Sequence, residues 1–397
     1  MQEISINDTI RKYDLIMEMG FRLRKDLGMK SQITMFVIIL ILAFVGVYSY
    51  FYNPAFQKTI AGFTEEDFSE DNIYSDLESL SIRLDEEIMS GSESFTIYLK
   101  DMDTGSIDKI NNSLDGIFGS AATYQQVGMI GNTYKKITIT IKRTTNYYAL
   151  KAYTEGVEIP DTEKKAKQLY EAITCIMNEC VDETMSDYEK ELALHDYLVK
   201  NCRYSQNVSQ PTGSDIYRAY GALVNGDAVC NGYAEALQLL FMCAGVESRF
   251  VIGTADGVDH AWNLVCLDGL WYHLDATWDD PVPDKGETAI HSFFNVTDAI
   301  MEKSHTWETK DYPNATSMNY NYYVHNNLYF EDFEDYQTKA YDVMVGNVQN
   351  HFEAVIENYR EGDDDMQFIF RNNDLYESVN WQTFCGDEYS VLVLQAE

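Results

Sequence analysis

Positive charge is scarce in this chain. Its 397 residues include 29 Lys and Arg against 64 Asp and Glu, which gives a formal net charge of −35 at pH 7. Proteins that bind nucleic acid take most of their affinity from Lys and Arg contacts with phosphates. A surface this acidic repels a phosphate backbone, so we expect no nucleic-acid partner. A cationic substrate fits the charge, and so does the simpler interpretation that acidity keeps an exposed protein soluble.

Metal-binding patterns are also absent. The seven cysteines show neither a CxxC pair nor a Cys/His spacing typical of zinc. The acidic run 363–365 lacks the alternating ligands of a calcium loop and indicates a solvated turn. We therefore expect no metal and no cofactor. An odd cysteine count outside the cytoplasm leaves a free thiol or an intermolecular bridge, and the other six could pair or be buried as small hydrophobic residues.

One apolar run is long enough to span a membrane. Residues 33–52 are almost entirely apolar, and about 20 residues at ~1.5 Å rise match a hydrocarbon layer of about 30 Å. Basic residues lie just before the run, at Arg22, Arg24, Lys25 and Lys30, and acidic residues follow it, at Glu65, Glu66 and Asp67. The positive-inside rule then predicts a single-pass cell-membrane protein with its N-terminus in the cytoplasm and everything after Asn53 outside. The alternative is a cleaved signal peptide, but the long leader and the bulky aromatics at the expected cleavage site argue against it.

The chain divides into five predicted regions. They are a cytoplasmic tail (1–32), a transmembrane helix (33–52), a stalk with a small α+β region (53–160), a core (161–315) and a C-terminal α+β region (316–397). Hydrophobic periodicity predicts the elements within them. These are strands over 95–99, 137–141, 147–153 and 389–394, helices over 162–179 and from Ser186, and a long amphipathic helix over 333–356.

Cys230 should begin a helix. A turn precedes it, and apolar residues at helical spacing follow as far as Gly245, which is typical of a helix end. A cysteine in the first turn lies at the positive end of the helix dipole, which favours the thiolate. The backbone N–H groups there can also receive an oxyanion. Gly232 would let a substrate approach closely. Taken alone, the alternative is a buried structural cysteine, since free Cys is among the most buried residue types.

His260 and Asp275 lie on a predicted hairpin. The segments 260–267 and 270–277 flank an Asp-Gly pair, which is a strong two-residue turn signal. This register puts His260 and Asp275 on one face as diagonal neighbours within side-chain reach, and a slip of one residue would separate them. Asp275 can then hold one imidazole nitrogen while the other faces Cys230.

The roles of the other hairpin residues are predicted less specifically. In this register Trp262 shares the face of His260, and Trp278 falls on the opposite face. Trp262 is therefore a candidate to line a cleft, although aromatic residues on a hairpin are more often core. His273 shares the face of His260, and we expect it to be a satisfied surface histidine.

A thiol, an imidazole and a carboxylate in this order are the parts of a cysteine nucleophile, its general base and the group that orients the base. The residues around them resemble the transglutaminase-like superfamily, a branch of the papain-like thiol enzymes, in its bacterial form, over about residues 186–313. The matching residues are Tyr220-Gly221-Ala222-Leu223, Val229-Cys230-Asn231-Gly232-Tyr233-Ala234, Gly253, His260-Ala261-Trp262-Asn263, residues 268–272, Asp275-Ala276-Thr277-Trp278-Asp279, Phe293-Phe294 and residues 304–307.

The resemblance implies an α+β core in which the helix that carries the cysteine packs on an antiparallel sheet that carries the histidine and the aspartate. It also implies that Cys230 is the nucleophile, His260 the base and Asp275 the orienter. The crosslinking enzymes of this superfamily have a tryptophan well before the nucleophile that stabilises the oxyanion. Here no Trp precedes Trp262, so that role is vacant or is taken by another residue, for which Tyr220 is the candidate.

Three functions remain open. In the first, a glutamine carboxamide acylates the thiolate and an amine accepts the acyl group. In the second, water is the acceptor, and the protein is a peptidase or amidase. In the third, the fold is a binding module without turnover, although the usual sign of that, a lost Cys, His or Asp, is missing. The expected partner is a protein or peptide substrate at the cell surface.

Overall fold

The computed structural model describes residues 72–107, 117–130, 134–207, 209, 211, 213–280, 289–357, 359, 376, 378–386 and 389–396. The chain forms two compact units, one drawn mainly from residues before Thr140 and one mainly from residues after it. Within the described ranges, no helix is long and apolar enough to cross a membrane. The predicted tail 1–32 and the predicted span 33–52 lie outside these ranges.

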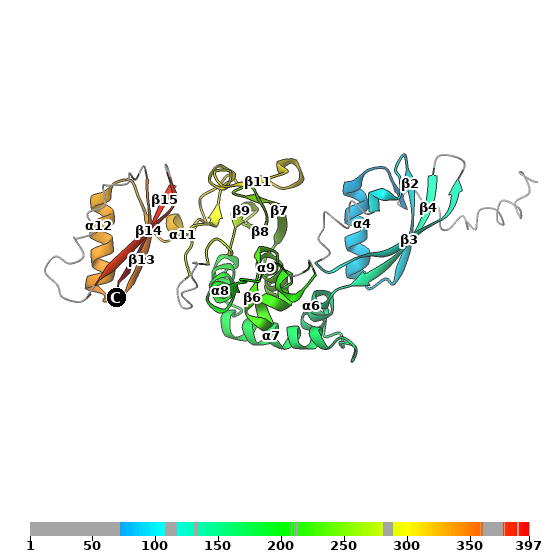
Figure 1. Cartoon of the computed structure of the whole chain (residues 1–397), viewed down its shortest axis with the longest axis horizontal. Helices are drawn as coiled ribbons and strands as arrows, with labels where there is room; N and C mark the ends of the chain where they lie inside the picture. The colour runs from blue at the N-terminus through cyan, green and yellow to red at the C-terminus, as the bar shows by residue number, and fades with distance from the viewer. Residues whose placement is uncertain are drawn as a thin grey trace, which may run out of the picture. The chain divides into compact units, whose positions relative to one another are not determined.

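The first unit is built on a four-stranded sheet. Its elements are β1 (Ile73–Tyr74), α4 (Leu77–Ser90), β2 (Ser94–Lys100), β3 (Gly119–Ile130) and β4 (Tyr134–Arg143), and the strand order is β1-β2-β4-β3. Figure 1 shows α4 beside this sheet. The strands predicted around 95–99 and 137–141 are confirmed, and Ile97 lies opposite Ile137 with both side chains fully buried.

The strand predicted over 147–153 is wrong. These residues belong to α6 (Thr145–Glu155), and the neighbours of β4 in the sheet are β2 and β3. The segment is rich in tyrosine, which favours strands. Its buried residues Tyr147 and Leu150 are three apart, however, and so lie on one face of a helix. Gly156 ends the helix in the left-handed region, with φ of 68°.

Three longer helices form the base of the core. They are α7 (Lys164–Cys180), α8 (Asp187–Asn201) and α9 (Cys230–Ala244). The predicted helices over 162–179 and from Ser186 are confirmed. Ser186 caps α8 through a reciprocal pair of hydrogen bonds with Glu189, which satisfies donors of the first turn. The predicted start of α9 at Cys230 and its end at Gly245 are confirmed as well.

A five-stranded sheet covers the other side of α9. It contains β7 (Ser248–Ala255), β8 (Val258–Leu267), β9 (Leu270–Leu274), β10 (Phe294–Val296) and β11 (His305–Trp307), in the order β10-β9-β8-β7-β11. The predicted pairing of Leu267 with Leu270 is confirmed. The strand β9 ends at Leu274, so Asp275 lies in the turn that follows the strand.

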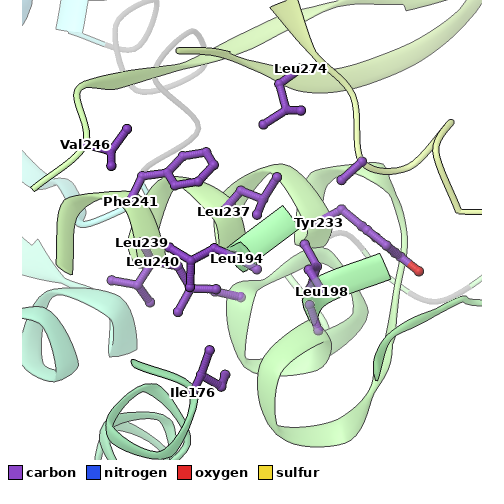
Figure 2. Packing of buried hydrophobic residues seen from close by; sticks show 14 of the residues in the cluster. Ile176, Leu194, Leu198, Tyr233, Leu237, Leu239, Leu240, Phe241, Val246 and Leu274 are labelled. Atoms are coloured by element: carbon purple, nitrogen blue, oxygen red, sulfur yellow. The ribbon is translucent and has the colours of Figure 1, made fainter. Parts of the chain in front are cut away.

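The helix α9 is the centre of the core. Every residue from Gly232 to Phe241 is buried, and the helix packs between the sheet and the helices α7 and α8 (Figure 1). Figure 2 shows its side chains between Leu274 on one side and Leu194, Leu198 and Ile176 on the other. The Asn263 side-chain amide donates to the Ala234 carbonyl at 3.0 Å, which ties β8 directly to α9.

Short elements connect these layers. They are β5 (Arg203–Tyr204), η2 (Asp215–Tyr217), η3 (Gly221–Asn225), β6 (Asp227–Ala228), α10 (Asp298–Met301), η4 (Thr309–Asp311) and α11 (Tyr322–His325). β5 pairs in parallel with β6 just before α9 begins.

The last part of the chain forms a second four-stranded sheet. Its elements are β12 (Tyr329–Phe330), α12 (Phe333–Tyr341), η5 (Asp342–Gly346), β13 (His351–Ile356), β14 (Val379–Gly386) and β15 (Tyr389–Ala396), in the order β12-β13-β15-β14. β12 is parallel to β13, as β1 is to β2. The two sheets thus share one topology, although the sequence shows only a general likeness between the regions.

The long helix predicted over 333–356 is wrong beyond Gly346. Phe352 and Ile356 lie in β13. Their spacing of four residues fits one turn of a helix and also two repeats of a strand, so this pattern alone does not separate the two. The strand predicted over 389–394 is confirmed as β15.

Candidate active site

Cys230 is the first residue of α9. Val229 is the N-cap with extended backbone, and its N–H donates to the Ile216 carbonyl at 2.9 Å. This bond and the pairing of β5 with β6 turn the chain sharply into the helix. Cys230 remains partly exposed, whereas the residues that follow Asn231 are buried. The thiol is therefore accessible and lies at the positive end of the helix dipole.

The structure brings His260 and Asp275 together. The Nε2 atom of His260 lies 2.7 Å from Oδ2 of Asp275. The other carboxylate oxygen, Oδ1, accepts the backbone N–H groups of Thr277 at 3.0 Å and Trp278 at 3.3 Å, because the chain turns immediately after β9. Since Asp275 occupies Nε2, the Nδ1 atom of His260 is the ring nitrogen left for another partner, and Cys230 is among the groups that raise the pKa of this ring.

The electrostatics of this group favour an imidazolium. Burial alone would lower the pKa of His260, but the charge and hydrogen bond of Asp275, together with the hydrogen bond to Cys230, raise that pKa to about 10. Burial would raise the pKa of Asp275, but the charge and hydrogen bond of His260, together with His305, hold it well below its usual range. A positive imidazole ring beside a sulfur atom stabilises the thiolate.

Among the cysteines whose side chains are described, Cys175, Cys180, Cys230, Cys243 and Cys266 are free thiols.

Trp262 packs against the ring of His260. It is 1 % exposed, and its ring stacks on His260 with centroids 6.0 Å apart. Its Nε1 donates to Nδ1 of His273 at 2.9 Å. Trp262 thus supports the imidazole from within the core, and it offers no face to a substrate.

Two other expectations about the hairpin are wrong. His273 is fully buried, and its Nε2 lies 2.9 Å from Oδ1 of Asp298, so it is no surface residue. Trp278 was expected on the opposite face, but its ring lies 6.3 Å from His260 and 4.6 Å from His305. The reason is that β9 ends at Leu274, and the alternation of a strand does not extend into the following turn.

Gly232 is required by the protein's own packing. A Cβ atom at this position would lie 2.7 Å from the Ile216 carbonyl oxygen and 2.8 Å from Cβ of Ala228. Contacts this short do not occur, so only glycine lets the first turn of α9 pack on the preceding segment. The sequence predicted that a substrate approaches Gly232 closely. In the structure, it is the preceding segment of the chain that does so.

Tyr220 is engaged with α7. Its hydroxyl donates to Oε1 of Gln168 at 2.7 Å, and Lys165 lies over its ring. The hydroxyl hydrogen of Tyr220 is therefore already donated to Gln168. Tyr204 is the tyrosine near the thiol: burial, and then the charge of Cys230, raise the pKa of its phenol. No sequence pattern indicated a role for Tyr204, because its position depends on the pairing of β5 with β6.

A second histidine contacts Asp275. His305 is buried, and its Nε2 lies 3.1 Å from the same Oδ2 that His260 reaches. The sequence placed His305 in a closing motif without a role. It lies 30 residues from Asp275, on a three-residue strand whose place is set by pairing with β7.

Among the residues that the structure describes, two groups of His and Asp have ligand atoms close enough for a metal ion. They are His195, Asp196 and His291, and His260, Asp275 and His305. In each group, imidazole nitrogens already lie within hydrogen-bond distance of the carboxylate. A metal ion would have to displace these hydrogen bonds.

Parts of the chain are similar to known proteins. The kyphoscoliosis peptidase of Mus musculus is 24 % identical over 132 residues, which cover 30 % of this chain and 20 % of that protein. The protein of that name from Homo sapiens is 23 % identical over 154 residues, which cover 34 % and 23 %. The chain thus matches about a fifth of the length of these relatives.

A solved structure described as a TGase is 16 % identical with a TM-score of 0.26, and the match covers 52 % of this chain and 58 % of that one. Residues 175–276 match the family model of the transglutaminase-like superfamily, and this segment contains Cys230, His260 and Asp275. The central part of this chain is a transglutaminase-like domain.

Proposed function

We propose that this protein is a thiol enzyme that attacks amide carbonyls and passes through an acyl-enzyme on Cys230. The observation that supports this most is the 2.7 Å contact of His260 with Asp275, which leaves the other nitrogen of the ring to the thiol at the start of α9. A cysteine nucleophile is activated by such an arrangement, in which a base acts on the thiol and a third group orients the base.

The first half-reaction forms a thioester. The Cys230 thiolate attacks the carbonyl carbon of a glutamine carboxamide or a peptide, and N–H groups of the first turn of α9 receive the oxyanion. The His260 imidazolium gives its proton to the leaving nitrogen, which departs as ammonia or an amine. In the second half-reaction, His260 takes a proton from the acceptor as it attacks the thioester, and Cys230 is released as the thiolate.

The acceptor decides the class of enzyme. With an amine such as a lysine side chain, the protein is an acyltransferase of the transglutaminase kind. With water it is a peptidase or amidase. Two observations favour water: the relatives are named peptidases, and no tryptophan precedes Trp262 to supply the oxyanion contact of the crosslinking enzymes. A binding module without turnover would not need the intact group of Cys230, His260 and Asp275.

One experiment separates these outcomes. The full chain and its Cys230→Ala variant are incubated with a glutamine-bearing protein and a primary amine, and the products are analysed by mass spectrometry. Amine addition that depends on Cys230 shows acyl transfer, whereas cleavage or deamidation that depends on it shows hydrolysis. Cys175→Ala is the matched control, because Cys175 is an exposed free thiol on α7. If the Cys230→Ala variant is as active as the wild type, the proposal is wrong.

We also propose that residues 33–52 anchor the protein, with the catalytic region outside the cell membrane and its substrates at the cell surface. The apolar run and its flanking charges support this. The test is the N-terminal peptide of the membrane-bound protein together with protease treatment of intact cells. Loss of residues 1–32 from the mature form, or protection of the catalytic region in intact cells, would contradict it.

A further inference from the structure

His305 and His260 share one carboxylate oxygen. Their Nε2 atoms lie 3.1 Å and 2.7 Å from Oδ2 of Asp275. The Nδ1 atom of His305 lies 2.8 Å from Oγ of Ser304. Because a carboxylate oxygen can only accept, Nε2 carries the hydrogen that points to Asp275, and the Ser304 hydroxyl can donate to Nδ1. Asp275 therefore accepts two imidazole N–H groups on one oxygen and two backbone N–H groups on the other.

A glycine makes this arrangement possible. In the register of β7 with β8, Gly253 lies opposite His260. A Cβ atom at Gly253 would lie 2.1 Å from the Thr306 carbonyl oxygen and 2.7 Å from the Trp262 ring. The missing side chain lets β11 approach β7 and makes room for the Trp262 ring, on which His305 packs with centroids 5.2 Å apart.

The surroundings of His305 are otherwise aromatic. Trp278 and Phe293 lie 4.6 Å and 5.4 Å from its ring. The titratable groups that face it are His260 from β8, Asp275 from the turn after β9, and His273 from β9. Little water reaches an aromatic environment of this kind. Each hydrogen bond to the Asp275 carboxylate therefore has a large effect on the electrostatic interaction of that carboxylate with its other partners.

We propose that His305 is a positioning residue that shares the charge of Asp275 and thereby sets how firmly His260 holds its proton. The inference rests on the proposed function, because it concerns the base of that reaction. A buried carboxylate paired with one imidazole holds the proton on that ring strongly. A base that keeps its proton cannot accept another from the acyl acceptor. The N–H group of His305, as the second donor to Oδ2, stabilises part of the negative charge of Asp275. It also fixes the rotation of the carboxylate.

Two substitutions distinguish the effect of the N–H donor of His305 from the effect of its aromatic ring. His305→Gln keeps an N–H donor near the position of Nε2, and His305→Phe keeps an aromatic ring without a donor. The full 397-residue chain is purified in detergent for the wild type and both variants. Alkylation of Cys230 by iodoacetamide is followed across pH by peptide mass spectrometry, with the exposed Cys175 as internal reference. Where turnover is found, kcat and KM are measured over the same pH range.

We expect the Phe variant to widen the pH range in which the Cys230–His260 ion pair exists. The midpoint of Cys230 alkylation falls by about one pH unit, because Asp275 acts on His260 alone. The alkaline limb of kcat/KM moves to higher pH, and kcat falls about tenfold with little change in KM. The Gln variant keeps the wild-type profile.

Two results would overturn the inference. One is an unchanged alkylation midpoint in the Phe variant, and the other is a shift in the Gln variant as large as in the Phe variant. Thermal unfolding of each variant identifies loss of folded protein, and His305→Met, which also lacks a donor, replaces the Phe variant if that one does not fold. An alkylation shift in a protein that turns over no amide would refute the proposed function and leave the charge sharing intact.

Discussion

At the scale of single residues, the site depends on buried groups whose charges balance one another. Asp275 is 1 % exposed, and it stays ionised because four N–H groups surround it. His260 is positively charged because Asp275 raises the pKa of the ring by more than burial lowers it. Glu191 shows the opposite case, in which burial dominates and raises the pKa of the carboxyl group to about 8.

Replacing Asp275 by Asn should remove the charge that holds the proton on His260. The raised pKa of about 10 then falls toward the ordinary value of 6.5, so the imidazolium disappears at lower pH. We expect kcat/KM to fall by roughly 10²–10⁴-fold, with its alkaline limb displaced downward. A pH profile of kcat/KM checks this. Asp259→Asn, an exposed carboxylate beside His260, is the control and should behave as the wild type.

Glu191→Gln should stabilise the protein at alkaline pH. Burial raises the pKa of Glu191 from 4.5 to about 8, although Asn295 donates to its Oε2 at 2.9 Å. The folded state therefore keeps a proton that the unfolded state loses, and stability falls as pH rises from 4.5 to about 8. The Gln variant lacks this loss, so its unfolding temperature should exceed that of the wild type near pH 8 and converge with it near pH 5. Parallel curves across this range would contradict the prediction.

At the scale of elements, α9 and the sheet hold the two halves of the site. α9 fixes Cys230, β8 fixes His260, and the bond from Asn263 to the Ala234 carbonyl joins them. The close approach of β7 and β11 then determines what surrounds Asp275. The two four-stranded sheets share one topology and lie before and after this domain in the chain.

Gly253→Ala should separate β11 from β7. The added Cβ atom would lie 2.1 Å from a backbone oxygen, which a side-chain rotation cannot relieve. We expect a loss of stability of roughly 1–3 kcal/mol or more, and a lower kcat as His305 moves away from Asp275. Denaturant unfolding and kcat measure the two effects. Gly346→Ala is the matched control, because nothing lies within 4 Å of its Cβ position.

At the scale of the whole molecule, a chain of buried charges connects the turn after β9 to β13. Asp279 lies 3.3 Å from His195, Asp196 lies 3.2 Å from His195 and 2.8 Å from His291, and the other ring nitrogen of His291 contacts Glu353. Glu353 also accepts the Tyr323 hydroxyl at 2.8 Å. The last sheet is thus joined to the domain that carries Cys230 by ionic contacts as well as by shared apolar packing.

Glu353→Gln should destabilise this connection. Burial would lower the pKa of His291, but Glu353 and Asp196 raise it to about 10. Loss of one partner leaves a buried charge incompletely paired, which costs roughly 3–5 kcal/mol. We expect a lower denaturant midpoint and reduced turnover, although Glu353 is 78 residues beyond Asp275 in the chain (353 − 275). The exposed Glu334→Gln is the control, and equal stability of both variants would refute the prediction.

The sequence by itself determined the features whose signals are local. The capping pair at Ser186, the helix that begins at Cys230 and ends at Gly245, and the register of the hairpin each depend on a few neighbouring residues. The same hairpin register predicted that His260 and Asp275 could meet, and the family resemblance added the order of their roles.

Only the tertiary structure decided the rest. His305 reaches Asp275 because β11 pairs with β7, which is about 50 residues earlier in the chain. Trp278 lies near His260 because β9 ends one residue before Asp275. His273 is buried because Asp298 and Trp307, from later segments of the chain, contact it. The spacing of Phe352 and Ile356 is compatible with a helix and with a strand. Pairing with β15 makes this segment a strand. Such outcomes depend on contacts between distant segments, and local periodicity carries no information about those contacts.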